Sequence, residues 1–350
     1  MRAMILERIC DLKEELKPLR LVEMAVPEPG NDEVLIQVEV CGVCHTELDE
    51  IEGRTPPPVF PVILGHEVVG RIVKTGSAVK SWQNGDRVGV AWIYSACGKC
   101  SWCRCGNENL CREFLATGRD RNGGYAEYMI APAGFVHMIP QFFSSSEAAP
   151  LLCAGSVGYR SLKLAEIKNG DVLGLTGFGA SGHLVLQVVR FLYPESRIMV
   201  FARNVQEREF ALRLGASWAG DTDERSPYKC RAIIDTTPAW KPVVEALANL
   251  EAGGRLVINA IRKESLDQNY LLHLDYARHL WQEKELKSVA NVTRADVSEF
   301  LQLAAEAGIK PEVREYELAE ANKALLELKG GEIKGAKILF IRHSIKKSKR

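Results

Sequence analysis

Two groups of cysteine and histidine residues in this 350-residue sequence could bind metal ions. The first lies in one short stretch that contains Cys44, His66 and Glu67. Thiolate and imidazole are the preferred protein ligands of zinc, and carboxylate is the usual third choice. The stretch therefore predicts most of a catalytic metal site. A half-buried cysteine beside surface histidines is the alternative, and the stretch alone does not decide between the two.

The second group is a run of four cysteines with the spacing C-x2-C-x2-C-x7-C, formed by Cys97, Cys100, Cys103 and Cys111. Two sulfurs with two residues between them can reach one ion from a single tight turn, and four thiolates complete a tetrahedron with no open position. The run therefore predicts a structural zinc site. A redox dithiol fits less well, because it needs only two cysteines. Cys105 could compete with Cys103, but the even spacing favours Cys103.

The composition is that of an ordinary globular protein of about two domains. The sequence is 46% hydrophobic and 26% charged, with 45 basic and 45 acidic residues. This balance argues against nucleic acid or lipid as the main partner. We find no apolar run of about 20 residues and no signal-peptide core, so we expect a cytoplasmic protein with reduced cysteines. The basic end of the sequence, His343 to Arg350, is expected to be a solvated tail.

The predicted pattern of strands and helices changes near the middle of the chain. In the first half, apolar and β-branched runs broken by Gly and Pro predict strands at residues 34–40, 67–73 and 86–90, and favour an antiparallel barrel or sandwich. From about residue 171, strands alternate with helices, which predicts a doubly wound parallel sheet. The expected strands are residues 171–176, 197–202, 232–236, 255–260 and 286–292, and the expected helices are residues 183–192, 205–214, 240–250 and 276–283.

A glycine-rich loop joins the first of these strands to the first helix. It contains Gly177, Gly179 and Gly182 in the order G-x-G-x-x-G, together with Ala180 and Ser181. The first glycine allows a tight turn, the second lets the backbone approach a pyrophosphate, and the third permits close packing of helix on strand. The free N–H groups and the dipole of the helix start favour bound phosphate. The loop therefore predicts a dinucleotide site.

The end of the second strand indicates which dinucleotide is preferred. An acidic residue there would bind the ribose 2′-hydroxyl of NAD, whereas an arginine suits the 2′-phosphate of NADP. The sequence has no acid at this point and has Arg203 instead. We therefore favour NADP(H) over NAD(H). A solvated surface arginine is the alternative.

These motifs together resemble the zinc-dependent alcohol dehydrogenases of the medium-chain dehydrogenase/reductase superfamily, and most closely the bacterial propanol-preferring and cinnamyl-alcohol-dehydrogenase-like members. The resemblance covers nearly the whole chain. It implies a GroES-like β-barrel catalytic domain formed by residues 1–155 and 296–350, with a structural-zinc lobe near residues 95–113. A Rossmann domain of residues 156–295 is inserted in it. The matching motifs are residues 42–46 (GVCHT), 65–67 (GHE), 106–111 (GNENLC), 152–155 (LCAG) and the glycine loop.

The resemblance also assigns the metal ligands. It implies that Cys44, His66 and Cys153 bind a catalytic zinc, and that Glu67 can enter its coordination shell. Cys153 by itself would be interpreted as a small buried hydrophobic residue. The four cysteines of the second group match the ligands of the structural zinc, which gives two zinc ions per chain.

Further roles follow from the same resemblance. Thr46 matches the hydroxyl that accepts the alcohol proton, His45 a position near the cofactor pyrophosphate, and Arg294 a basic residue that contacts the cofactor. Two positions differ from many relatives. Glu47 stands in place of an aspartate that orients the histidine ligand. Asp49 stands in place of the histidine that ends the proton relay, so the relay is expected to end in a carboxylate or in water.

The implied function is reversible hydride transfer between a primary or secondary alcohol, with its carbonyl product, and a nicotinamide cofactor. The implied assembly is a homo-oligomer, either a tetramer or a dimer. Two alternatives are a zinc-free quinone or enal reductase of the same fold and a non-catalytic dinucleotide-binding protein. The two groups of metal-ligand residues argue against the zinc-free reductase.

Overall fold

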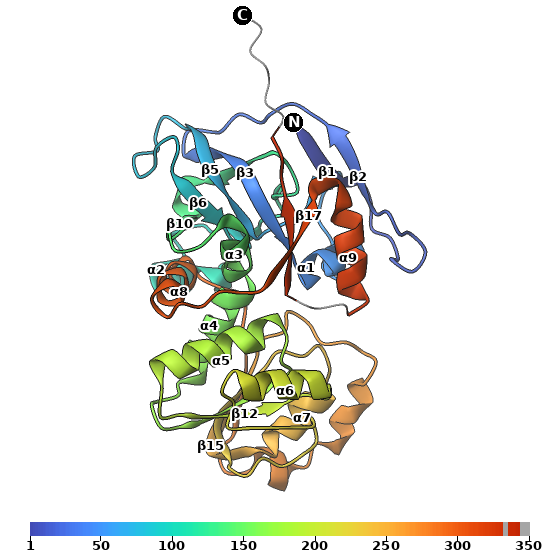
Figure 1. Cartoon of the computed structure of the whole chain (residues 1–350), viewed down its shortest axis with the longest axis vertical. Coiled ribbons are helices and arrows are strands. Elements are labelled where there is room, and N and C mark those ends of the chain that lie inside the picture. Colours follow the sequence, from blue (N-terminus) through green and yellow to red (C-terminus); the bar gives the residue numbers. More distant parts are fainter. Residues whose placement is uncertain (332–334, 344–350) are drawn as a thin grey trace, which may run out of the picture. The chain divides into compact units, whose positions relative to one another are not determined.

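The computed structural model describes residues 1–331 and 335–343, and the chain forms two compact units (Figure 1). The first unit consists of Met1–Cys153, Thr293–Ala305 and the chain from Lys310 on, and the second of Ala154–Val292 and Glu306–Ile309. The basic tail lies outside the described residues from residue 344 on. Within the described residues, no helix has the length and apolarity to cross a membrane.

The first unit is built on a seven-stranded, mostly antiparallel sheet in the order β10-β6-β5-β3-β18-β17, with β9 also paired to β3. The three strands expected in the first half of the sequence are present as β3, β5 and β6. The C-terminal strands β17 and β18 return to this sheet, and β18 pairs with β3. The bounds are β3 Glu33–Val43, β5 Val68–Thr75, β6 Arg87–Val90, β9 Tyr128–Pro132, β10 Val136–Met138, β17 Val313–Glu317 and β18 Ala336–Phe340.

Smaller elements complete the first unit. A three-stranded sheet in the order β2-β1-β4 lies beside short helices, and the cysteine-rich lobe contains a two-stranded sheet of β7 and β8. The strands are β1 Arg2–Leu6, β2 Leu19–Glu23, β4 Val62–Ile63, β7 Ile93–Ser95 and β8 Leu115–Ala116. The helices are α1 His45–Ile51, α2 Ser101–Arg104, α3 Ser145–Ala148, α8 Arg294–Glu306 and α9 Ala321–Lys329, with 3-10 turns at Glu108–Leu110, Ala133–Phe135, Ala149–Leu152 and Leu318–Glu320.

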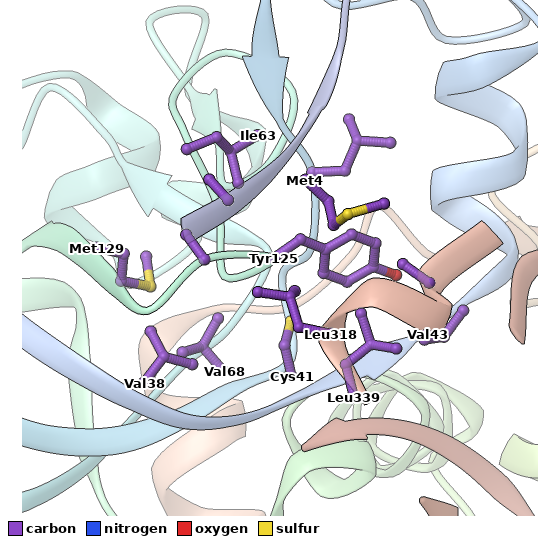
Figure 2. Packing of buried hydrophobic residues seen from close by; sticks show 14 of the residues in the cluster. Met4, Val38, Cys41, Val43, Ile63, Val68, Tyr125, Met129, Leu318 and Leu339 are labelled. Carbon is purple, nitrogen blue, oxygen red and sulfur yellow. The ribbon is translucent and has the colours of Figure 1, made fainter. Parts of the chain in front are cut away.

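Tyr125 occupies the middle of the core of the first unit (Figure 2). Its side chain is fully buried and packs among Met4 of β1, Cys41 of β3, Leu318 of a 3-10 turn and other apolar residues. Burying an aromatic ring of this size is one of the larger single contributions to a hydrophobic core. The core thus joins β3 to the C-terminal strands and fixes the end of β3, where the first predicted metal ligand follows.

The second unit is a doubly wound parallel sheet in the order β13-β12-β11-β14-β15-β16, with helices α4 to α7 (Figure 1). The expected fold class, a GroES-like domain with a parallel Rossmann sheet, is confirmed. The strands are β11 Val172–Thr176, β12 Arg197–Phe201, β13 Trp218–Gly220, β14 Cys230–Asp235, β15 Leu250–Ile258 and β16 Glu285–Ser288. The helices are α4 Ala154–Ala165, α5 Ala180–Leu192, α6 Val205–Arg213 and α7 Lys241–Leu247.

The segment before β16 differs from the sequence-based expectation. A helix was expected at residues 276–283, but the chain forms a 3-10 helix at Gln268–His273 and a five-residue π-helix at Tyr276–Leu280. Gln282 and Glu283 have φ angles of 74° and 60°, so the chain leaves the right-handed region and the helix ends. The expected strand 286–292 is likewise shortened to Glu285–Ser288, and Asn291 has a φ of 58°.

Candidate metal centre and dinucleotide loop

Four predicted ligands converge in the first unit. One donor atom each from Cys44, His66, Glu67 and Cys153 lies within 4.8 Å of the others. His66 Nε2 is 3.2 Å from Cys153 Sγ, and Cys44 Sγ is 3.9 Å from Cys153 Sγ. Two thiolates bound tetrahedrally to zinc at about 2.3 Å would be roughly 3.8 Å apart. The donor set and its spacing therefore fit a zinc ion.

Three separate segments deliver these ligands. Cys44 lies between the end of β3 and the start of α1, and His66 and Glu67 immediately precede β5. Cys153 follows the 3-10 turn Ala149–Leu152 and is the last residue of this part of the first unit. The pairing of β3 with β5 brings the first two segments together, because Cys41 pairs with Val68.

Two glycines are required for this arrangement. A Cβ atom on Gly42 would lie 1.8 Å from the Glu67 carboxylate, so only glycine leaves room for that side chain. Gly65 has a φ of +97°, and a Cβ there would lie 2.4 Å from the buried ring of Tyr125. Only glycine adopts this conformation freely. The core around Tyr125 therefore determines the backbone that presents His66.

Glu47 contacts His66, the predicted histidine ligand, despite being one methylene longer than the aspartate of many relatives. Its Oε1 lies 2.6 Å from His66 Nδ1, and its Oε2 accepts a hydrogen bond of 2.7 Å from the backbone N–H of Cys44. The contact with Nδ1 leaves Nε2 directed at Cys153. A carboxylate behind a ligating histidine fixes the ring and increases its basicity. The longer side chain thus contacts two ligand residues at once.

The electrostatics of the group favour a bound cation. A hydrogen bond from the Cys153 thiol lowers the pKa of Cys44 well below its usual range, despite the opposing effect of burial. Burial alone would lower the pKa of His66, but the charge of Glu47 and the hydrogen bond to Cys44 raise it well above its usual value. Burial, and then the charge of Cys44, raises the pKa of Glu67. A metal cation would replace the protons shared among these groups.

The predicted relay residues lie on α1, beside the ligands. The Thr46 hydroxyl is 3.7 Å from Cys44 Sγ and is nearly buried, whereas His45 is exposed. Asp49 is buried, and its carboxylate accepts a 2.6 Å hydrogen bond from Arg54 Nε. The carboxylate that replaces the usual histidine is thus held in an ion pair. The roles of these three residues in proton transfer stay predictions.

Sequence analysis missed Glu50, which is also on α1. This residue is 0% exposed, and neither of its carboxylate oxygens has a hydrogen-bond partner among the described residues. Burial, and then the charge of Glu47, raises the pKa of Glu50 well above its usual value. A buried polar group without a partner costs free energy. The sequence of α1, HTELDEI, is mostly polar, so it has no apolar face that would have indicated that Glu50 is buried.

Replacing Glu50 by methionine is expected to raise the free energy of unfolding by about 1–3 kcal/mol, because the change removes an unpartnered polar group and keeps a similar volume. The pKa of Glu50 is higher in the folded chain than in the unfolded chain. Its contribution to stability is therefore complete below the unfolded pKa and is lost as the pH rises through the folded pKa. The gain in the Met variant should be larger at pH 8 than at pH 5.

Urea unfolding of the Glu50→Met variant at the two pH values measures this gain. Glu50→Gln is the matched control, because it keeps a polar group and should recover little stability at pH 5. A Met variant less stable than the unmodified chain at both pH values would contradict the prediction.

The second group of cysteines forms a compact cluster in the lobe. Sulfurs of Cys97, Cys100, Cys103 and Cys111 lie within 4.8 Å of one another, with 3.9 Å between Cys97 and Cys103 and 3.5 Å between Cys100 and Cys103. Backbone N–H groups near the first sulfur lower the pKa of Cys97 to about 7, which favours the thiolate. Cys105 is exposed, and its sulfur donates to the carbonyl of Trp102 instead.

The glycine loop has the geometry of a phosphate-binding turn. Gly177 has a φ of +77°, α5 begins at Ala180, and a Cβ on Gly179 would meet no atom within 4 Å. A Cβ on Gly182 would lie 2.8 Å from the carbonyl oxygen of Gly177, which shows how closely helix and strand approach. The Ser181 hydroxyl donates to the carbonyl of Ala154, so it is engaged within the second unit.

Arg203 is exposed just beyond the end of β12, and its contact with the adenosine ribose stays a prediction. Two neighbours on α6 were missed. Arg208 donates from Nη1 to the carbonyl of Ala202 at 2.9 Å and pairs with Asp221 at 3.1 Å. Glu207 is half-buried, and burial raises its pKa. Their position one turn after Asn204, the N-cap of α6, is the signal that could have identified them.

Arg294 begins α8 in the first unit, where its side chain is engaged by protein groups. Its Nε pairs with Glu108 at 3.0 Å, its Nη1 donates to the carbonyl of Gly134, and the guanidinium lies over the Phe135 ring. The predicted cofactor contact of Arg294 stays a prediction.

The fold and the two ligand groups are those of the medium-chain dehydrogenase/reductase superfamily. Residues 30–141 match the family model described as the alcohol dehydrogenase GroES-like domain. The chain is 43% identical over 329 residues to the probable alcohol dehydrogenase AdhA of Mycobacterium tuberculosis, covering 93% of each chain. It is 33% identical to an alcohol dehydrogenase of Geobacillus stearothermophilus, covering 95% of this chain and 98% of the relative. The chain belongs to the zinc-type alcohol dehydrogenases of this superfamily, a family of oxidoreductases.

The fold of this chain is also similar to that of a solved structure. The cobalt- and zinc-bound thermostable alcohol dehydrogenase of Pyrobaculum aerophilum aligns with a TM-score of 0.83 at 26% identity, covering 97% of this chain and 99% of that one. The resemblance inferred from the motifs is thereby confirmed at the level of the family.

Proposed function

We propose that this chain interconverts primary or secondary alcohols and their carbonyl products by hydride transfer to and from a nicotinamide cofactor. One zinc ion is held by Cys44, His66 and Cys153, and a second by the four-cysteine cluster. The observation that carries the proposal is the convergence of the Cys44, His66, Glu67 and Cys153 donors on one point, with His66 oriented by Glu47.

The metal and the nicotinamide would supply the chemistry that side chains lack: a Lewis acid that makes the alcohol more acidic, and an acceptor for its hydride. The chain's own groups hold and move the proton. The Thr46 hydroxyl lies 3.7 Å from Cys44 Sγ, and we expect it to take the proton of a substrate alcohol while passing its own proton on to the relay that leads to solvent. Glu47 fixes the ring of His66, and Glu67 provides a fourth donor beside the three fixed ligands.

Metal content tests the proposal directly. The purified chain is expected to contain two zinc ions. Dialysis against a chelator that removes the ion bound by Cys44, His66 and Cys153 should abolish alcohol oxidation while dinucleotide binding persists. The four-cysteine cluster is closed and should lose its metal more slowly. Elemental analysis and NADPH fluorescence measure the two properties. A chain with fewer than two zinc ions, or one that oxidises alcohols without metal, would contradict the proposal.

We further propose that the cofactor is NADP(H) rather than NAD(H). Arg203 stands where NAD-specific chains have an acid, and Arg208 adds a second guanidinium near the end of β12. An arginine at this point can bind the 2′-phosphate. The half-buried Glu207 opposes this preference, because its carboxylate would repel a phosphate.

Replacing Arg203 by alanine is expected to lower kcat/KM for NADP⁺ about tenfold to a hundredfold and to leave kcat/KM for NAD⁺ within about threefold, because only NADP⁺ carries the phosphate. Steady-state kinetics with both cofactors measure the effect. Arg213→Ala, at the far end of the following helix α6, is the matched control and should change neither value. An unmodified enzyme that prefers NAD⁺ would overturn the argument.

The alternative of a non-catalytic dinucleotide-binding protein predicts no turnover with any substrate. A panel of alcohols and aldehydes assayed with both cofactors distinguishes it and also defines the substrate class. The homo-oligomeric state and the cytoplasmic location stay predictions.

A further inference from the structure

A buried ion pair lies at the carboxyl edge of the parallel sheet in the second unit. It joins Asp235, the last residue of β14, to Lys263 in the loop after β15, and the two side chains are 0% and 7% exposed. The neighbouring strand β11 ends at Thr176, which pairs in register with Asp235, and the glycine loop begins at the next residue, Gly177. In open parallel sheets this edge is where nucleotides bind.

Both charged groups are fully engaged. Lys263 Nζ donates to Asp235 Oδ2, to the carbonyl of Thr237 at 2.7 Å and to the carbonyl of Ala239 at 3.1 Å, which uses all three of its protons. Asp235 Oδ1 accepts from the hydroxyls of Thr176 at 2.5 Å and Thr237 at 2.8 Å. A buried ion pair with so many hydrogen bonds specifies one arrangement of the segments it joins.

The loop after β15 contacts the turn after β14 at two further points. The backbone N–H of Glu264 donates to the carbonyl of Pro238 at 2.7 Å. The carboxylate of Asp267 accepts from the backbone N–H groups of Trp240 at 2.9 Å and Lys241 at 2.8 Å, at the start of α7. Residues 259–267 therefore clasp residues 236–241, and Lys263 is the buried centre of this clasp.

The clasped turn is in direct contact with the glycine loop. A Cβ on Gly177 would lie 2.8 Å from the Thr237 methyl group and 2.9 Å from the Thr236 hydroxyl. Thr236 also donates to the carbonyl of Thr176 from both its backbone N–H and its hydroxyl, each at 3.0 Å. A movement of residues 236–237 would therefore move the tight turn whose backbone approaches the pyrophosphate.

We propose that Lys263 is a positioning residue for dinucleotide binding, an inference that rests on the proposed nicotinamide cofactor. By neutralising Asp235 and binding the carbonyls of Thr237 and Ala239, it holds the turn that supports Gly177. Lys263 lies outside the glycine motif, and its contact with Asp235 spans 28 residues of sequence.

The test is a double-mutant cycle on the full-length, zinc-loaded chain. Lys263→Met leaves Asp235 as a buried charge without its cation and frees two buried carbonyls, so the Kd for NADPH is expected to rise about tenfold or more. Because the chemistry itself is untouched, kcat at saturating cofactor should stay within about twofold. The double variant Asp235→Asn/Lys263→Met contains no uncompensated charge. Its Kd for NADPH should therefore be at least about threefold lower than that of Lys263→Met.

Two controls make the result specific. Lys263→Arg keeps the cation and should bind NADPH within about threefold of the unmodified chain, and it remains informative where Lys263→Met does not fold. Lys168→Met removes an exposed lysine of the same unit and should have no effect. A purely structural role would lower Tm in Lys263→Met with an unchanged Kd for NADPH, and that outcome overturns the inference. An unmodified chain that binds no dinucleotide would instead refute the proposed function.

Discussion

Replacing Cys44 by alanine is expected to lower alcohol oxidation by about a thousandfold or more. Loss of a Lewis acid removes several kcal/mol of stabilisation of developing charge, and each 1.36 kcal/mol corresponds to about a factor of ten in rate. The hydrogen bond from the Cys153 thiol also lowers the pKa of Cys44 well below its usual range, which favours the thiolate form that binds metal. The remaining donors would hold a cation less tightly.

Three measurements on the Cys44→Ala variant separate this effect from misfolding. Its zinc content should fall from two ions to one, its Kd for NADPH should be unchanged, and kcat should be nearly lost. The glycine loop and the four-cysteine cluster do not contain Cys44, so both should remain functional. Cys105→Ala is the matched control: its exposed thiol belongs to neither group, and the variant should keep both metals and full activity. A Cys44→Ala variant with normal turnover would show that the chemistry takes place elsewhere.

The second large effect concerns Glu47, whose carboxylate contacts His66 Nδ1 and the backbone N–H of Cys44. Glu47→Gln is expected to weaken zinc binding at the catalytic group by about tenfold to a hundredfold, the usual range for partners that orient a ligand. An amide has only one acceptor oxygen, so it cannot accept from both donors, and its NH₂ group would oppose one of them.

Competition with a chromophoric chelator measures the zinc affinity of Glu47→Gln, and kcat under saturating zinc reports whether orientation matters once metal is bound. Glu52→Gln provides the comparison, because Glu52 caps the same helix but pairs with Arg54 and Lys329 rather than with a ligand. Equal zinc affinity in Glu47→Gln and Glu52→Gln would mean that His66 does not need its carboxylate partner.

Much of the fold was predictable because its elements carry strong local signals. The strands of the second unit are short apolar runs, and G-x-G-x-x-G between a strand and a helix indicates the first turn of a dinucleotide-binding βαβ unit. The end of the segment before β16 was not predictable, because Gln282 and Glu283 adopt positive φ without the glycine that normally marks such positions. Tertiary contacts determine those conformations.

In the candidate site, too, some residues have a local sequence signal and others depend on tertiary contacts. Residue types and spacing singled out Cys44 and His66 as candidate ligands, whereas Cys153 stands among apolar residues and was proposed only from the family resemblance. The contact of Glu47 with Cys44 is local, but its contact with His66 depends on the pairing of β3 with β5, which brings residues 19 positions apart together. The unpartnered carboxyl of Glu50 and the Lys263 clasp depend on burial, which the sequence around them does not encode.

The position of the third ligand has a consequence for how the two units can be exchanged. Cys153 is the last residue of its part of the first unit, and the second unit begins at the very next residue, Ala154. A recombination point placed one residue too early would separate the metal centre from one of its ligands, although both units would keep every element of their folds. The second unit could thus be exchanged as a complete fold, but its first junction with the first unit lies directly beside Cys153, a proposed metal ligand.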